Sequence, residues 1–173
     1  FFREVIAHVT FRSLWQTKCT PKIKVFGWFL LSDRLNTRNM LKRRHYNIGS
    51  NFDCLLCGPH IEETAEHLFF HCTFSNECWQ HLDIYWAEVG NRLDLVRQLK
   101  ERHPRKMIME TFLVAAWSLW KERNNNHFRH IAPSVTSWWA RFKTDFCNIQ
   151  YRLPAHKRHV VSSILQNLSQ DLP

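Results

Sequence analysis

The sequence predicts a mainly α-helical fold, interrupted by one short segment that is rich in Cys and His. The chain has 173 residues with only four Gly beside six Pro, which argues against a sheet-rich fold full of tight turns. Apolar residues recur at helical spacing along most of the chain. Hydrophobic residues make up 45% and charged residues 23%, so disorder over most of the chain is excluded.

Two helices are predicted in the first third of the chain. Pro21 suits the first turn of a helix. The apolar residues of the run 25–31 cover nearly all sides of that helix, so the helix should be buried. Asn36 or Thr37 can cap the next helix. This helix should end in the basic run 42–45, because cations are favourable near a helix C-terminus.

Further helices are predicted after an irregular segment at residues 46–63. Ser75 is expected to cap a helix whose apolar stripe has spacings of 3, 4 and 3, formed by Trp79, Leu82, Trp86 and Val89. His103-Pro104 marks a break, and the long helix after it should end near residues 124–126, since Asn suits caps and turns. Pro133 and Pro154 each precede another helical pattern.

Charge is strongly positive and unevenly distributed. The formal net charge is +9, composed of +7 over residues 1–53, −4 over residues 54–103 and +6 over residues 104–173. A surplus of this size favours a polyanionic partner, with nucleic acid first. The alternative is a basic protein whose charges only solvate helix faces.

Several protein classes are excluded by missing patterns. The longest apolar run, Val25 to Leu31, is too short for a membrane span. With no secretory signal, we expect an intracellular protein, nuclear or cytoplasmic and not secreted. Because the first residue is Phe, we expect a segment of a longer protein. No nucleophile–base motif or Gly-rich phosphate loop is present, so we expect no enzymatic activity of this chain and no small-molecule substrate.

The Cys and His spacing predicts a metal site. Cys54 and Cys57 form a Cys-x-x-Cys turn, followed after nine residues by His67 and after four more by Cys72. Zinc takes four such ligands tetrahedrally, and Gly58 suits the turn because it tolerates positive φ. His71 or Cys78 remains an alternative fourth ligand. With all four positions filled by protein, we expect one structural Zn²⁺ that holds residues 50–75 folded.

At these residues the chain resembles a known family. The zinc-binding domain that follows the reverse transcriptase in plant LINE-type (non-LTR) retrotransposons has a similar block, here Cys54-Leu-Leu-Cys57-Gly58, then Glu63-Thr-Ala-Glu-His-Leu-Phe-Phe-His-Cys72 and Trp79. The flanks resemble it too, in the basic aromatic segment 21–38 and in Trp117-Ser-Leu-Trp120-Lys-Glu-Arg-Asn124-Asn-Asn-His-Phe128. One departure is Leu55, where the family often has Pro.

The resemblance implies a domain organisation and a set of ligands. Residues 11–103 would form the reverse-transcriptase-associated zinc-binding domain, and residues 104–173 a C-terminal helical region beyond a soft boundary. The family's ligands fall on Cys54, Cys57, His67 and Cys72. The resemblance also implies an accessory module that assists nucleic-acid handling during copying of element RNA. The chain has no Asp-Asp pair of a polymerase palm and no acidic set of a ribonuclease H, so it is not expected to polymerise.

The expected function is therefore that of a zinc-stabilised nucleic-acid-binding module, for RNA or DNA, with the reverse-transcriptase domain of the same polyprotein as a further partner and no membrane contact. The candidate phosphate-binding residues are Lys22, Lys24, Arg34, Arg38, Lys42, Arg43 and Arg44. The helical spacing of most Trp indicates core positions. The alternatives are a protein–protein interaction module and a domesticated or decayed retroelement fragment, in both of which zinc is only a staple.

Overall fold

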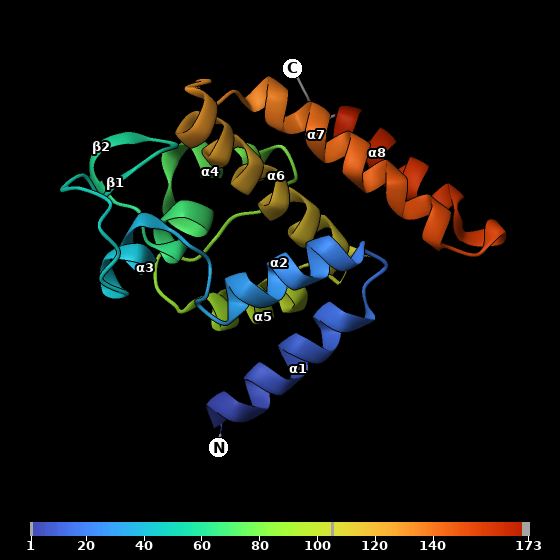
Figure 1. Ribbon diagram of the computed structural model, residues 1–173. Coiled ribbons are helices and arrows are strands. Elements are labelled where there is room, and N and C mark those ends of the chain that lie inside the picture. Colours follow the sequence, from blue (N-terminus) through green and yellow to red (C-terminus); the bar gives the residue numbers. More distant parts are fainter. Residues whose placement is uncertain (1, 105, 171–173) are drawn as a thin grey trace.

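A computed structural model describes residues 2–104 and 106–170 (Figure 1). Residues 105 and 171–173 of the predicted C-terminal region lie outside the described residues. The elements in chain order are α1 (Phe2–Gln16), α2 (Pro21–Leu31), α3 (Arg38–Arg43), β1 (Asp53–Cys54), β2 (Gly58–Glu62), η1 (His67–His71), α4 (Thr73–Gln80), α5 (Arg92–Arg102), α6 (Ile108–Arg129), α7 (Val135–Cys147), η2 (Asn148–Arg152), η3 (Ala155–Lys157) and α8 (His159–Gln170). The mainly helical fold, with a small Cys/His knuckle between helices, is confirmed.

The long helix α6 organises the core. It packs against α2, α5 and α7, and most of its residues from Ile108 to Leu119 are fully buried. The contact with α2 depends on Gly27, because a Cβ there would lie 2.5 Å from Leu113 Cδ2. One hydrophobic cluster joins residues on both sides of positions 100–104. The front and back of the chain therefore share a core.

Two helix starts, those of α2 and α3, follow the predicted local chemistry. Thr37 caps α3, with its hydroxyl accepting from the backbone N–H of Met40 at 3.2 Å. Ser134 caps α7 in the same way. Pro21 occupies the first turn of α2 as predicted. The burial expected on nearly all sides of this helix was wrong, because Phe26, Leu30 and Leu31 are buried whereas Val25 is 43% and Phe29 37% exposed. In residues 2–104 and 106–170, none of the helices combines the length and apolar character needed to cross a bilayer.

The helix predicted to start at Ser75 and run past Trp86 was wrong at both ends. Helix α4 begins at Thr73 and stops at Gln80, and Ser75 lies inside it, donating to the carbonyl oxygen of Leu68 at 2.6 Å. Trp86 lies on the following loop and still packs edge-on against Trp79, whereas Val89 is 85% exposed. The apolar spacing therefore came from two separate segments that meet in the core.

The end predicted for the long helix was also wrong. Asn124, Asn125 and Asn126 continue α6, which ends at Arg129. The Asn126 side chain does not compete with the helix, because a tertiary partner takes it up: its Nδ2 donates to the carbonyl oxygen of Leu55 at 2.6 Å. The intrinsic turn preference of Asn is thus overridden by a contact 71 residues away.

Core positions for most Trp are confirmed. Trp79 and Trp138 are fully buried and Trp139 nearly so. Three more pack half-buried against the core, namely Trp86, Trp117 and Trp120. Trp15 departs from the pattern, with half of its surface exposed.

A buried ion pair joins the knuckle to α6. Glu63, which follows β2, accepts from Arg123 Nη2 at 2.7 Å, and both side chains are almost fully buried. The same carboxylate accepts from the backbone N–H of Arg38 at 3.0 Å and of Leu55 at 3.3 Å. Glu63 therefore connects three segments, because each of them supplies a donor that would otherwise lack an acceptor.

Replacement of Glu63 by Gln should lower the free energy of unfolding by about 3–5 kcal/mol, because it leaves the buried Arg123 cation without its counter-charge. Urea unfolding of the zinc-loaded protein measures this. The control is Glu101→Gln, which removes an exposed pair with Arg97 and should cost no more than about 0.5 kcal/mol. Equal losses in the two variants would show that the Glu63–Arg123 pair does not connect these segments energetically.

Candidate metal centre

The first two candidate ligands lie on the hairpin of β1 and β2. The strands pair antiparallel, with Cys54 opposite Gly58, so the chain from Cys54 to Cys57 forms the turn between them. Gly58 has a φ of +96°, a conformation that side chains disfavour. The backbone N–H of Leu56 points at Cys54 Sγ, 3.5 Å away. The turn thus directs both Cys sulfurs to one side.

The other two ligands flank η1, a single turn of π-helix: His67 is its first residue and Cys72 follows its last. Thr64 accepts from the backbone N–H of His67 at 3.0 Å at the start of this turn, and the N–H of Cys72 closes it on the carbonyl oxygen of His67 at 2.7 Å. This i→i+5 bond widens the turn. Residues five apart diverge on an α-helix of 3.6 residues per turn, but here His67 and Cys72 face the same space.

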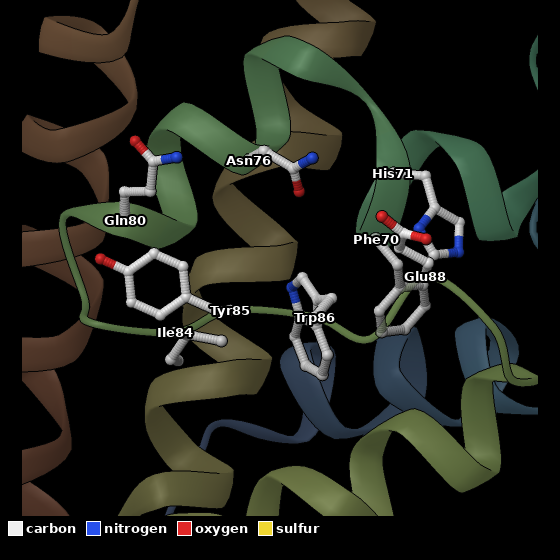
Figure 2. Close-up of a pocket in the computed structure, with 8 residues that line it drawn as sticks. All are labelled: Phe70, His71, Asn76, Gln80, Ile84, Tyr85, Trp86 and Glu88. Carbon is white, nitrogen blue, oxygen red and sulfur yellow. The ribbon is translucent and has the colours of Figure 1, made fainter.

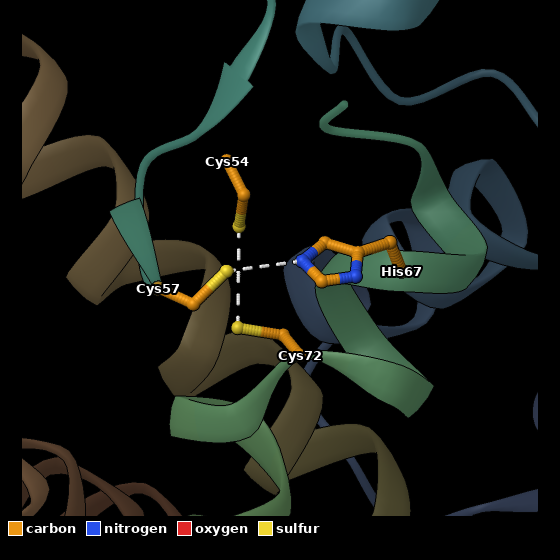
Figure 3. A group of neighbouring side chains, drawn as sticks. All are labelled: Cys54, Cys57, His67 and Cys72. Atoms are coloured by element: carbon orange, nitrogen blue, oxygen red, sulfur yellow. Dashed lines mark hydrogen bonds between the residues drawn. The ribbon is translucent and has the colours of Figure 1, made fainter. Parts of the chain in front are cut away.

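The four donor atoms converge on a space of the size of one metal ion (Figure 3). All of them lie within 4.8 Å of one another. Cys54 Sγ is 3.9 Å from Cys72 Sγ, and Cys57 Sγ is 3.2 Å from His67 Nε2. Tetrahedral bonds to Zn²⁺ place such atoms about 3.5–3.8 Å apart. The group therefore fits one Zn²⁺ with three sulfurs and one imidazole nitrogen.

Protons are shared among the sulfurs of this group. The Cys54 thiol donates a hydrogen bond to Cys72. This bond, followed by burial, raises the pKa of Cys54 to about 12. The same bond lowers the pKa of Cys72. For Cys57, burial is the main cause of a raised pKa, and the charge of Cys54 is the second. Zinc binds thiolates, so a bound dication would take the place of these protons.

The two alternative fourth ligands lie elsewhere. His71 points into a separate cavity of about 450 Å³ beyond α4, which it lines with Asn76, Tyr85 and Trp86 (Figure 2). Cys78 is fully buried on α4, and burial raises the pKa of its thiol. In the described part of the chain, neither belongs to the group of converging ligand atoms. Sequence spacing could not separate His71 from Cys72, because the π-turn decides which of them faces His67.

A shell of hydrogen bonds fixes the Cys-x-x-Cys turn from outside. The amide of Leu55 donates to Glu63, and its carbonyl accepts from Asn126. Arg38 Nη1 donates to Asn51 Oδ1 at 2.9 Å and to the carbonyl oxygen of Asp53 at 3.1 Å. These partners hold the ligand backbone in place, a role that outer-shell groups commonly have in metal sites. Asn126 and Glu63 lie within the segments that carry the family resemblance, but their spacing did not mark them as supports of the metal site.

The seven predicted phosphate-binding residues do not form one patch of free cations. Lys24 Nζ donates to the carbonyl oxygen of Trp15 at 2.8 Å, where it stabilises the C-terminal end of α1. Arg38 supports the knuckle, as described above. The remaining five residues are all largely exposed. They are Lys22, Arg34, Lys42, Arg43 and Arg44. Three of these, Lys42, Arg43 and Arg44, gather at the end of α3.

Replacement of Cys72 by Ser should abolish stoichiometric zinc binding, whereas His71→Ala should leave one zinc per chain. Loss of a ligand should weaken binding by more than the roughly 10- to 100-fold that follows loss of an outer-shell partner. Competition with a chromophoric chelator measures the affinity. A larger loss in His71→Ala than in Cys72→Ser would mean that the π-turn does not set the ligand choice.

Comparison with known proteins gives one match, which covers the knuckle. Residues 2–79 match the model of a family described as zinc-binding in reverse transcriptase. No curated protein and no solved structure matches the chain significantly. The match includes all four converging ligands and extends back through α1, ahead of the start predicted at residue 11. By this match and by the geometry of its Cys3His group, the front of the chain is similar to the zinc-binding domains associated with reverse transcriptase.

Proposed function

We propose that this chain is a zinc-stabilised, non-catalytic module that binds nucleic acid for the reverse transcriptase of a plant LINE-type element. The observation that carries the proposal is the position of α3: the β1–β2 hairpin of the metal centre contacts this helix and would hold its exposed basic end in place. The backbone N–H of Asn39 donates to the carbonyl oxygen of Glu63 at 3.1 Å, and Asn39 Nδ2 donates to Glu62 at 3.1 Å. Folding of the hairpin around zinc would therefore fix α3.

The cations of α3 are available to phosphates although two of them have carboxylate neighbours. Lys42 lies 3.2 Å from Glu62 and Arg43 lies 2.6 Å from Asp33. Both cations are about half exposed, and such surface pairs contribute about 0–1 kcal/mol. Arg44 Nη1 donates to the neutral Asn36 oxygen, at 3.4 Å. Phosphates can therefore displace the carboxylates at little cost.

Arg34 and Lys22 add two further exposed cations at other positions, after α2 and in its first turn. The Arg34 guanidinium lies over the Trp28 ring, 5.1 Å from its centroid, and Lys22 lies over Trp117 at 5.0 Å. These contacts restrict the side chains while the charges remain exposed. Contacts of this type go to the backbone of nucleic acid and carry little base specificity.

The zinc would act as a structural ion in this function. Four protein ligands leave no coordination position for water or substrate, which supports a binding role and not catalysis at the metal. Residues of β2 are mostly exposed, so apolar burial contributes little to this strand, although Cys54 and Leu56 before it are buried. The ion would replace that missing burial and keep the α3 surface in place.

The variant Lys42→Ala/Arg43→Ala/Arg44→Ala should bind nucleic acid more weakly, with a shallower dependence on salt. Loss of three phosphate contacts should reduce the slope of log affinity against log salt by about 2 for a single strand. Fluorescence anisotropy with a labelled oligonucleotide at several salt concentrations measures both quantities.

The matched control is Arg152→Ala/Lys157→Ala/Arg158→Ala, which removes the same charge from exposed positions after α7. We expect its salt slope to stay near that of the wild type. An unchanged slope in the α3 variant would place the footprint elsewhere. Salt-insensitive binding of a protein partner, without nucleic-acid binding, would favour the interaction-module alternative.

A further inference from the structure

A cavity of about 330 Å³ lies between α3 and the C-terminal half of α6. Its walls come from Asn36, Arg38 and Leu41 on one side, and from Trp120, His127 and Phe128 on the other. The second wall belongs to the Trp117–Phe128 segment quoted in the sequence analysis, of which only Arg123 and Asn126 support the metal centre. The volume of the cavity is within the roughly 300–1,000 Å³ of small-ligand pockets.

The cavity has a positive electrostatic environment. The Arg38 guanidinium donates to Asn51 and to a backbone carbonyl, both neutral acceptors, so its charge persists beside the cavity. The pKa of His127 is lowered, first by partial burial and then by the charges of Arg123 and Arg38. Arg123 itself is neutralised by Glu63. An anionic group is therefore favoured near Arg38.

The rim of the cavity carries an aromatic ring that the protein core does not use. Phe128 is 72% exposed although it is large and apolar. The His127 ring lies close to it at a steep angle, with centroids 4.5 Å apart, while most of the Phe128 side chain stays open to solvent. Exposed rings beside cations are typical of surfaces on which unpaired bases stack.

The cavity is continuous with the proposed phosphate-binding surface. Asn36 lines the cavity, and its side-chain oxygen accepts from Arg44 Nη1 at the end of α3. A chain of phosphates along α3 would therefore arrive at the cavity mouth. The side-chain amides of Asn36 and Asn124 line the same space and offer donors and acceptors to a base edge.

We propose that this cavity takes one unpaired nucleotide of a single-stranded nucleic acid, with its base on Phe128 and its phosphate beside Arg38 and Arg44. The inference rests on the proposed function and deepens it, because it predicts a preference for single strands. A duplex keeps its bases stacked and paired, so it can use the cations of α3 but not the Phe128 ring. Stacking on a ring and charge contacts to phosphate are open to every base, so the main preference should be for strand state.

The test compares Phe128→Ala with the wild-type chain, zinc-loaded, on labelled oligouridylate and on its duplex with oligoadenylate. We expect single-strand binding to weaken roughly 5- to 150-fold, the range for loss of one base–aromatic stack. Duplex binding should stay unchanged. The Phe128→Trp variant keeps an aromatic ring, so it should bind the single strand as the wild type does. Tyr151→Ala is the control, because Tyr151 is equally exposed at 72% on η2.

The outcomes separate the two proposals. Equal weakening on single strand and duplex, or no weakening on either, would overturn the nucleotide site while leaving nucleic-acid binding by α3 intact. Wild-type protein that binds neither probe would overturn the proposed function itself. Photocrosslinking of bromouridine-substituted RNA gives a second readout, because the crosslinked peptide should contain Phe128. A crosslink confined to other peptides, or wild-type capture of an acidic peptide in preference to RNA, would also contradict the nucleotide site.

Discussion

The convergence of three sulfurs and one imidazole on a single ion-sized space is the constraint on which the rest of this structure depends. The hairpin that supplies two of the sulfurs has only two strands, of which the second is mostly exposed, so it is at best marginally stable without a further constraint. The π-turn that supplies the other two ligands is a rare backbone form, which is often found at functional sites. Both irregular segments are explained if a metal ion holds them together.

Glu63 extends this constraint into the helical body. Its backbone accepts from α3 and its carboxylate accepts from the backbone of Arg38 and Leu55 and from Arg123 of α6. A change in the structure of the knuckle should therefore also change the position of α3 and the surroundings of Arg123 in α6. This coupling gives a physical reason why a structural ion matters for a binding surface that contains none of its ligands. It also places the aromatic cavity between α3 and α6 within the same supported unit.

Much of the fold was accessible from sequence because caps and prolines mark helix starts with local chemistry. Thr37, Ser134 and Pro21 are examples in which the local signal and the structure agree. The failures lie where tertiary contacts override local preference. Asn126 stays helical because Leu55 provides an acceptor, and Trp86 reaches the core from a loop and not from a helical stripe. The ligand choice between His71 and Cys72 depended on a π-turn, which no spacing rule signals. The exposure of Phe128 was equally unpredictable, since periodicity describes core positions and says nothing of a ring left at a rim.

The most direct test of the account is the amount of metal bound to the protein, measured by elemental analysis of chain purified without added zinc. The account predicts one zinc per chain, with release of the ion loosening the hairpin, η1 and α3 in hydrogen exchange while the helices of the core stay protected. Protein that carries no metal, yet protects the hairpin and η1 as fully as the core, would contradict it. In that case the Cys3His group would be an ordinary part of a helical interaction domain.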